Sequence, residues 1–488
     1  MKELVRRLLG EKIQGYVIIR VQLRREWGIR FANGRIERVS TGWDSGIGIQ
    51  AFTENGVCGF ASADILSEEV GLAVLERAMK LARRNEELGA DKNRKIFDAP
   101  VVIKDVPSEA KHPFEEMSLS ELQERVAYLH KRLSEKRQDV VWQTSYRQVE
   151  DSWCIGRSDG TLIAYTVPRA VLMHQGTVKV NQKAQSLLVH RSGTDLEILL
   201  AEKADQVLEK QASERADFAR AVCLAPPLPA GHYPLIIDYG LAKGLAHEAF
   251  GHAVESDHIN ESVLGDNGKL KRGLKVAREG VHIIDGPLNG DWAYQPFSAN
   301  GLERKTVEIV RNGILEAGLG DIFSAEEAGM PVTGAGRAEG YSYVPLPRMT
   351  NIRLLVDNVL PLSPNPKLMD EVKNLRQTLV DHGELEQDNH LLLLGYRGGQ
   401  VNPKTGDFVF QCDGIINLAD PNLPVYQPSI FSGKILSALK AIKLGLGQGC
   451  FNAIGTCGKR GQAVPSSGGS HMYLLLEADK EVSLGGES

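Results

Sequence analysis

The sequence predicts an α+β protein with two domains, and three observations support this prediction. Hairpin signals and helical patterns are mixed in the first 224 residues, a Pro-rich segment occupies 224–231, and short Gly-rich strand patterns continue to about residue 425. We therefore expect an N-terminal mixed α/β domain over residues 1–224 and a C-terminal β-rich domain over residues 231–488. A chain of 488 residues is long enough to give each domain its own core.

Two Asn-Gly pairs predict β-hairpins near the N-terminus. Asn33-Gly34 separates two strand-like stretches, and Asn55-Gly56 separates the next two. Asn and Gly adopt positive φ at little cost, which the tight turn of a two-residue hairpin requires. Strand patterns return between residues 140 and 189, around Asp159-Gly160.

Apolar residues at helical spacing predict the helices. The pattern covers residues 67–84, 118–137, 195–220 and 432–443. The second of these begins with Ser-Leu-Ser-Glu, the signature of a capping box, in which the first Ser and the Glu satisfy each other's free backbone N–H groups. The charges of the long helix at 195–220 are expected to form a solvated face.

Composition and charge exclude several classes of function. The net charge is −5, so no basic excess exists to neutralise the phosphates of nucleic acid. The first ten residues lack the apolar core of a signal peptide, and no run of about 18 apolar residues predicts a membrane span. Six scattered cysteines do not form a disulfide framework. We expect a cytoplasmic protein that binds neither a membrane nor nucleic acid directly.

The most informative segment is His247-Glu248-Ala249-Phe250-Gly251-His252. Two histidines beside a glutamate are the groups with which zinc hydrolases hold the metal and activate its water. These histidines are five residues apart, which places them about 140° apart on a regular helix, too far to share one ion. If both bind, the helix must be kinked or bulged between them, and Gly251 tolerates such a distortion. Otherwise Glu248 and His252, four residues apart, form an ordinary pair on a straight helix.

The flanking residues favour a metal site. Residues 236–246 are apolar and small, as expected of a strand that leads into a buried helix. Buried histidines and carboxylates are costly unless they are paired or bound to a metal. Glu255 and Asp257 follow closely and are placed to orient the histidines from behind.

Sequence spacing does not choose the third ligand of the metal. A catalytic zinc takes three protein ligands and keeps one open position. Cys457 lies in a Gly-flanked loop, although a cysteine chosen at random is more often a small buried hydrophobe. The available residues after His252 are Glu255, Asp257, His258, His282, His382, His390, Cys412, Cys450, Cys457 and His471.

The chain resembles the TldD/PmbA family of metallopeptidases, and within it the TldD-type catalytic subunit. Residues 247–257 are similar to the family's His-Glu-x-x-x-His segment. Pro-Arg-Met-Thr-Asn at 347–351 and the stretch at 457–465 resemble signatures of the C-terminal domain, and weaker similarity lies at 398–403 and 45–49. The resemblance covers most of the chain.

This resemblance implies His247, His252 and Cys457 as zinc ligands and Glu248 as the catalytic carboxylate. It also implies a cytoplasmic dimer that encloses a chamber, either a homodimer or a heterodimer with a TldE-like subunit that lacks the metal motif. Family members act on small, unfolded peptides. The chain departs from the family pattern at 466–471 and 334–339, which affects the expected substrate preference more than the chemistry.

We therefore expect a zinc-dependent peptidase in which Glu248 takes a proton from the attacking water and passes it to the leaving amine. Strand addition of an extended peptide would suit broad specificity. Arg348 and His471 are candidates for stabilising the oxyanion, although Arg348 is also typical of a structural fork on backbone carbonyls. Two other hypotheses remain: a non-catalytic peptide-binding or regulatory subunit with a structural zinc, and a regulator that acts through nucleic acid.

Overall fold

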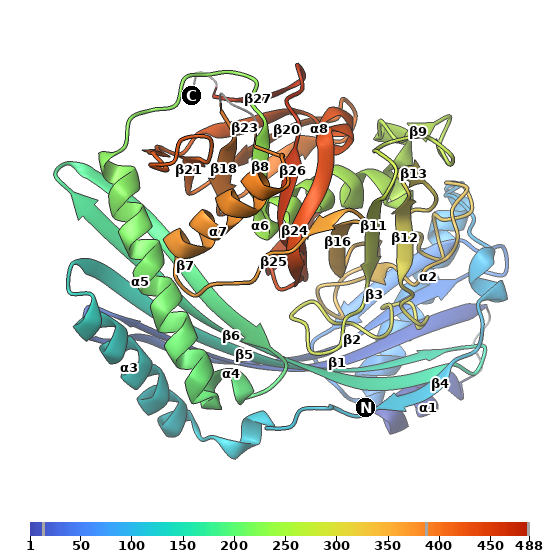
Figure 1. Ribbon diagram of the computed structural model, residues 1–488. Helices are drawn as coiled ribbons and strands as arrows, with labels where there is room; N and C mark the ends of the chain where they lie inside the picture. The colour runs from blue at the N-terminus through green and yellow to red at the C-terminus, as the bar shows by residue number, and fades with distance from the viewer. Residues whose placement is uncertain (12–14, 386–388, 486–488) are drawn as a thin grey trace.

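The computed structural model describes residues 1–11, 15–385 and 389–485, and it confirms the predicted α+β class. In Figure 1 the long strands of the N-terminal part form a curved sheet, and the C-terminal part lies against its concave side. We propose that the segment 224–231 separates two domains. No helix of the described residues is long and apolar enough to cross a membrane.

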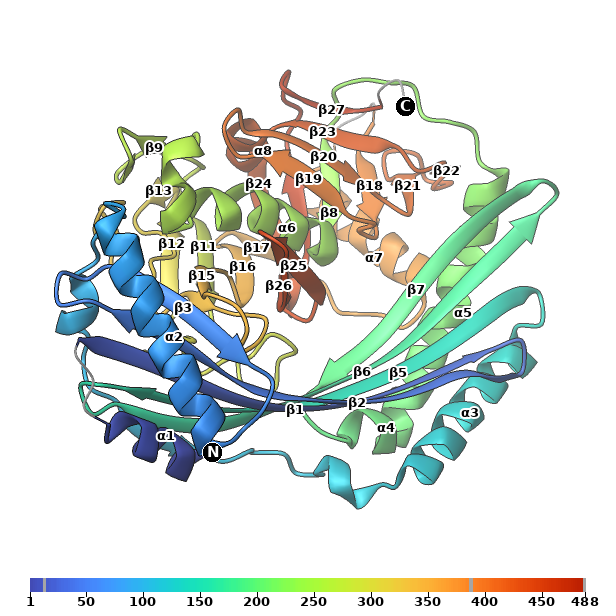
Figure 2. The ribbon, with the colours of Figure 1, turned by 180° about the vertical axis from the view of Figure 1, so that it is seen from behind.

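The N-terminal sheet has the strand order β3-β2-β1-β5-β6-β4. Strand β7 also pairs with β6, along a later part of that strand than β4 does. Helices α1 and α2 lie at one end of the sheet and α3 and α5 at the other, as Figure 2 shows. The bounds are α1 Lys2–Leu9, β1 Tyr16–Ala32, β2 Arg35–Phe52, β3 Cys58–Ala63, α2 Glu68–Glu87, η1 Lys95–Asp98, β4 Ile103–Val106, η2 Phe114–Glu116, α3 Leu119–Lys136, β5 Val140–Arg157, β6 Leu162–Val180, β7 Lys183–Gly193, α4 Glu197–Leu200 and α5 Glu202–Leu224.

The predicted hairpins and the first two helices are confirmed. Asn33 and Gly34 have φ of 54° and 70°, the positive values that a tight two-residue turn needs. The turn at Asn55-Gly56 also joins two paired strands, but its loop spans residues 53–57, and of the pair only Gly56 has positive φ. Ser118 and Glu121 form the predicted capping box at the start of α3.

Two helical predictions needed correction, and helices α1 and α7 were not predicted. The pattern at 195–220 is two helices, because Ala201 between α4 and α5 is extended (ψ 93°). The pattern at 432–443 is helical only in α8, Ile435–Ala441, since strands β23 and β24 adjoin it on either side. Helix α7, Leu368–Asp381, was missed, although its buried residues Leu368, Val372, Leu375 and Leu379 have helical spacing.

The C-terminal sheet has the order β13-β12-β11-β16-β26-β8-β18-β21-β22, with β24 and β25 also paired to β26 and β17 to β24. A smaller sheet has the order β19-β20-β23-β27. The bounds are β8 Leu235–Asp238, α6 Tyr239–Ala246, β9 Gly265–Asp266, β10 Lys269–Leu270, β11 Val281–Gly286, β12 Val307–Arg311, β13 Ile314–Leu315, β14 Gly336–Arg337, β15 Leu346–Pro347, β16 Asn351–Val356, β17 Val359–Leu360, β18 Leu391–Leu394, β19 Gly399–Asn402, β20 Asp407–Gln411, β21 Gly414–Asn417, β22 Val425–Tyr426, β23 Ile430–Lys434, β24 Ile442–Cys450, β25 Gly455–Lys459, β26 Gln462–Leu476 and β27 Val482–Leu484.

Strand β8 divides the C-terminal core into two faces. Leu235 and Ile237 belong to the apolar cluster that includes Leu241 of α6, whereas Ile236 belongs to the cluster that includes Val372 of α7. Alternate residues of a strand point to opposite sides of the sheet, so α6 covers one face and α7 the other. The chain enters α6 directly from this central buried strand, which holds the beginning of the histidine segment in place.

Candidate metal centre

Asp238 fixes the start of the helix that carries the histidines. Its Oδ1 accepts a hydrogen bond of 2.9 Å from the backbone N–H of Leu241, as an N-cap residue does. Its Oδ2 accepts a second bond of 2.6 Å from the N–H of Gly395, which follows β18. The cap therefore ties the first turn of α6 to the neighbouring strand of the sheet.

The helix widens into a π-helical turn, η3, over His247–Gly251. The backbone N–H of His252 donates to the carbonyl of His247, five residues earlier, and this confirms the predicted bulge. A five-residue turn brings His252 over His247 on one side of the helix. Gly251 leaves room for Met349 there, because a Cβ at this position would lie 1.7 Å from Sδ of that side chain.

The bulge brings the two histidines and Cys457 together. The imidazole centroids are 5.2 Å apart with an interplanar angle of 88°, and Sγ of Cys457 lies 3.5 Å from Nε2 of His252. One ligand atom from each of the three residues lies within 4.8 Å of the others, and within residues 1–11, 15–385 and 389–485 no other such group is found. Cys457 comes from β25, about 200 residues along the chain, which pairs with β26.

The donor atoms fit a zinc ion. Two imidazoles and a thiolate are ligands that zinc prefers, and three protein ligands leave one coordination position open. In the part of the chain that the structure describes, Nδ1 of His247 is buried and has no hydrogen-bond partner. A buried nitrogen without a partner costs free energy, and a bound metal ion would remove that cost. His247 and Cys457 are 2% and 1% exposed, but the His252 side chain is 20% exposed, so the group is reached from one side.

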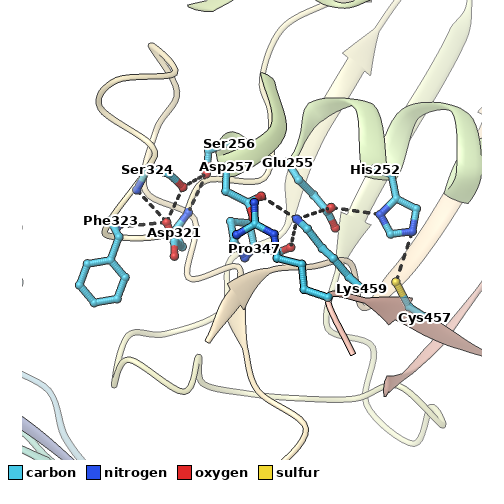
Figure 3. Close-up of polar contacts among 11 residues, drawn as sticks. His252, Glu255, Ser256, Asp257, Asp321, Phe323, Ser324, Pro347, Cys457 and Lys459 are labelled. Atoms are coloured by element: carbon cyan, nitrogen blue, oxygen red, sulfur yellow. Dashed lines mark hydrogen bonds and ion pairs between the residues drawn. The ribbon is translucent and has the colours of Figure 1, made fainter. Parts of the chain in front are cut away.

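Charged groups behind His252 orient its ring (Figure 3). Nδ1 of His252 donates to Oε2 of Glu255 over 3.0 Å, the contact that a metal-binding histidine makes with a supporting carboxylate. Lys459 donates to the same oxygen over 2.8 Å and to Oδ1 of Asp257 over 2.6 Å. Glu255 thus contacts a histidine as predicted, whereas Asp257 binds Lys459 instead. Lys459 was missed, although alternation along a strand places it on the same side as Cys457.

The protonation of Cys457 and His252 is coupled. Burial raises the pKa of the Cys457 thiol, but His252 and Arg348 more than offset this and lower it below its usual value. Burial likewise lowers the pKa of His252, and the charge of Glu255 together with the Cys457 contact raises it well above its usual value. These shifts favour a thiolate, which is the form of cysteine that binds metals.

His247 and Glu248 are affected mainly by burial. Burial, with the nearby charge of Lys243, lowers the pKa of His247 well below its usual value, so this ring stays neutral. A neutral imidazole is the form that binds a metal. Burial raises the pKa of Glu248, and the charges of His252 and Lys243 oppose that shift. Lys243 was missed, although it lies one turn before His247 and is itself buried.

The two oxyanion candidates have structural contacts. Arg348 is fully buried, and its guanidinium donates to the backbone carbonyl of Cys457, so it holds strand β25, which carries the third ligand where the sequence predicted a loop. The ring nitrogens of His471 lie 3.2 Å from the carbonyl of Gly447 and 3.3 Å from the N–H of Val356. His471 is therefore held within the sheet, away from the histidine pair.

Comparison with known proteins gives matches to one family over most of the chain. Models of the PmbA/TldA metallopeptidase C-terminal domain and domain 1 match residues 230–446 and 17–84. A metalloprotease of Methanothermobacter thermautotrophicus is 30% identical over 471 residues, 94% of each chain. A zinc metalloprotease TldD homolog of Saccharolobus solfataricus is 26% identical over 260 residues, 53% of this chain and 52% of its own.

The fold is also shared with a solved structure. TldE from Thermococcus kodakarensis has a TM-score of 0.72 and 17% identity, with 100% of both chains covered. The sequence matches place this chain among the metallopeptidases. The chain belongs to the PmbA/TldD family, which confirms the resemblance found in its motifs.

Proposed function

We propose that the protein is a zinc-dependent peptidase that hydrolyses small, unfolded peptides, and that it is the TldD-type, catalytic member of its family. His247, His252 and Cys457 hold the zinc ion, and Glu248 is the general base. The observation that carries this proposal is the π-helical turn, which brings the two histidines together over a five-residue spacing. A zinc metalloprotease among the relatives supports the choice of metal.

The residues around the site perform the acid–base steps. Bound zinc supplies an acidified water and a Lewis acid for the peptide carbonyl. Glu248 accepts the proton of the attacking water and delivers it to the leaving amine. Its raised pKa favours this role, because a carboxylate whose pKa lies closer to neutrality is a stronger base toward the proton of the water. Glu255 keeps the His252 ring in the orientation in which Nε2 faces Cys457.

Strand β25 is suited to hold an extended substrate. In the described ranges it pairs with β26 alone, so its outer edge is free of a second strand beside Cys457. Extended peptides pair with such edges through main-chain hydrogen bonds, whatever their side chains. A folded domain offers no free extended segment, which is why we propose unfolded peptides as substrates.

The alternative, a non-catalytic subunit with a structural zinc, requires a fourth protein ligand. Within the described residues no fourth His, Cys, Asp or Glu joins the three. Glu255, the carboxylate that contacts His252, already accepts from His252 and Lys459. Three ligands and an open position are typical of catalytic zinc, so the geometry favours the peptidase.

We also propose that the chain works in the cytoplasm as a dimer, with itself or with a TldE-like subunit. Residues 35–46 of β2 pair only with β1 in the described structure, so this long edge is free for another chain. The edge exposes Trp43, Val39 and Ile36, at 62%, 38% and 42%. Light scattering on the purified protein would show the dimer, and a monomer at micromolar concentration would contradict a homodimer. The net charge of −5 stands against direct binding of nucleic acid.

The test combines metal analysis with digestion of one protein in a folded and a permanently unfolded form. We expect one zinc per chain, cleavage of the unfolded form and survival of the folded form. Cys457→Ala should lose zinc and activity together, while Cys412→Ala, which alters another buried cysteine, should keep both. Full zinc occupancy in Cys457→Ala would remove that residue from the ligand set. Equal cleavage of both forms would contradict selection for unfolded chains.

A further inference from the structure

A second site lies between the N-terminal sheet and the hairpin that carries Cys457. A cavity of about 150 Å³ opens between strands β1, β5 and β6 on one side and the β25–β26 hairpin on the other. In Figure 1 the hairpin points toward this sheet. The volume is well above the ~10–15 Å³ that one water needs, so the cavity admits a group of several heavy atoms. Its charged lining residues are Arg24, Arg147, Arg169, Arg337, Asp151 and Glu339.

The arginines are arranged from an exposed mouth to a buried floor. The Arg147 and Arg24 side chains are 41% and 27% exposed, whereas the Arg169 side chain is 6% exposed and Arg337 is 1% exposed. Positive charge that continues inward along low-dielectric walls attracts anions and guides them to the floor.

The two buried arginines are bonded mainly to neutral oxygens. Arg169 donates to the carbonyls of Trp292 and Tyr294 over 2.9 and 2.8 Å, and its nearest carboxylate, Asp151, lies 3.7 Å away. Arg337 donates to Oε1 of Gln295 over 2.7 Å and to backbone carbonyls, including that of Pro465 over 2.7 Å.

The charge of Arg337 is therefore left without a counter-ion. The partners of its Nε and Nη1 are neutral oxygens, and no carboxylate contacts Arg337 among the described residues. Burial, together with the charges of Arg169 and Arg348, lowers the pKa of Arg337 to about 9. A buried guanidinium without a counter-ion is costly, and a bound anion would remove that cost.

The two carboxylates on the cavity wall do not fill this need. Asp151 accepts a hydrogen bond of 2.7 Å from Gln22, and Glu339 accepts one of 2.7 Å from the N–H of Ala463. At the mouth, Arg147 and Arg24 share the single carboxylate of Glu26. Four arginines therefore line a cavity with fewer acidic partners, and the excess positive charge lies toward the floor.

Apolar and aromatic side chains complete the cavity wall. Trp153, Tyr165 and Trp292 are all buried and lie among the lining residues. A guanidinium presents paired donors that match a carboxylate, and aromatic walls favour an apolar group attached to it. A carboxylate on an apolar residue has this combination, as at the C-terminus of a peptide.

The cavity lies just behind the metal ligands. Thr456 and Pro465, paired across the hairpin, line the cavity, and Cys457 follows Thr456 on β25. Alternate residues of a strand face opposite sides, so the cavity and the Cys457 thiol occupy the two faces of one thin hairpin.

We propose that this cavity binds the free C-terminal carboxylate of a peptide, with the apolar side chain of the terminal residue against the aromatic wall. The proposal rests on the proposed peptidase function for its role, which is to select peptide ends over internal segments. The carboxylate enters past Arg24 and Arg147 and is held by Arg169 and Arg337.

Calorimetric titration separates this site from the metal. The protein is the full chain carrying Glu248→Gln, measured with zinc bound and again after a chelator. The probes are acetyl-alanyl-phenylalanine with a free carboxylate, its C-terminal amide, and acetyl-aspartyl-phenylalaninamide, which carries its carboxylate on a side chain. We expect the free acid to bind on the order of tenfold or more tightly than either amide, with and without zinc, and less tightly at high salt.

Two arginine variants locate the binding. Arg24→Gln should weaken the free acid by about three- to tenfold, because it removes one charge at the mouth while Glu26 keeps Arg147 as its partner. Arg30→Gln, an exposed position six residues further along the same strand and not among the residues that line the cavity, should leave the affinity unchanged.

Four results would overturn the proposal. Equal binding of acid and amide, or no binding, would show that the cavity does not take a carboxylate. A preference that disappears with the chelator would place the carboxylate on the metal. Equal binding of the aspartyl peptide would remove the selection for chain ends, and an unchanged affinity in Arg24→Gln would exclude this cavity. The titration measures binding with and without zinc and does not depend on peptide cleavage. A failure of the peptidase proposal is therefore distinguishable from a failure of the carboxylate site.

Discussion

Glu255 is bonded to both His252 and Lys459 through the same carboxylate oxygen, Oε2, at 3.0 and 2.8 Å. Lys459 lies on the strand that provides Cys457, two residues after that cysteine, while His252 closes the π-helical turn. This one oxygen therefore ties together the two chain segments that carry the candidate ligands. Positions behind a metal ligand of this kind affect how tightly the metal is held.

Replacing the carboxylate that orients His252 should weaken zinc binding. Glu255→Gln keeps the shape but removes the charge that supports the imidazole, so we expect zinc affinity to fall by about 10- to 100-fold. Competition with a chelating dye measures the affinity. Asp257→Asn is the matched control, because Asp257 contacts Lys459 but no histidine in the described structure. An equal loss in both variants would assign the effect to Lys459.

Removing the proposed base should separate catalysis from metal binding. Glu248→Gln should keep zinc and the fold but lose peptide hydrolysis by about 10²–10⁴-fold, since the amide cannot accept the water's proton. Turnover of an unfolded peptide and elemental analysis are measured on the same sample. Glu261→Gln, an exposed glutamate shortly after the turn, should leave the rate unchanged. Near-normal turnover of zinc-loaded Glu248→Gln would exclude Glu248 as the base.

The π-helical turn should depend on the space at Gly251. Gly251→Ala places a Cβ 1.7 Å from Sδ of Met349, so the turn or the methionine must shift. We expect a loss of about 1–3 kcal/mol in the free energy of unfolding, measured by urea denaturation, and lower zinc content. Gly458→Ala is the control, because a Cβ there meets nothing within 4 Å.

A double variant tests that explanation. Gly251→Ala combined with Met349→Ala should cost less than the sum of the two single changes, because the shortened side chain leaves room for the new Cβ. Simple additivity would show that the cost of Gly251→Ala does not come from the close approach of Met349.

Acid should destabilise the fold through His174. Burial lowers the pKa of this histidine to about 3, from about 6.5 in an unfolded chain, and its Nδ1 lies 2.8 Å from Oγ1 of Thr144. The unfolded state then binds the proton more readily. The stability contribution is therefore complete above about pH 6.5 and is lost as the pH falls toward 3, at about 1.4 kcal/mol per pH unit.

Urea denaturation from pH 7.5 to pH 4.5 measures this slope. His174→Gln should flatten it by about that amount, whereas His382→Gln, on the exposed end of α7, should leave it unchanged. An identical slope in His174→Gln and the parent protein would mean that another group controls acid unfolding.

Local chemistry made much of the fold and part of the site predictable. The capping box of α3, the Asn33-Gly34 turn and the need for a bulge between His247 and His252 follow from rules that act over a few residues. The predictions of one helix over 195–220 and of a helix over 432–443 were wrong, because Ala201 is extended between α4 and α5 and because strands β23 and β24 adjoin α8. Helical spacing in α7 was present but was not recognised.

The sequence by itself determined the residue types of the histidine segment, and with them the class of chemistry. It also determined their spacing, and a five-residue interval between ligands demands a widened turn. It did not determine which of many candidates could join them. Only the tertiary structure brings Cys457 to His252, closes the contacts of Lys459 with Glu255 and Asp257, and places four arginines around one cavity. The physical reason is that the contacts of Cys457 and Lys459 join residues 202 to 205 positions apart, and that the four arginines are spread between residues 24 and 337. Their meeting depends on sheet pairing and core packing and not on any short-range pattern.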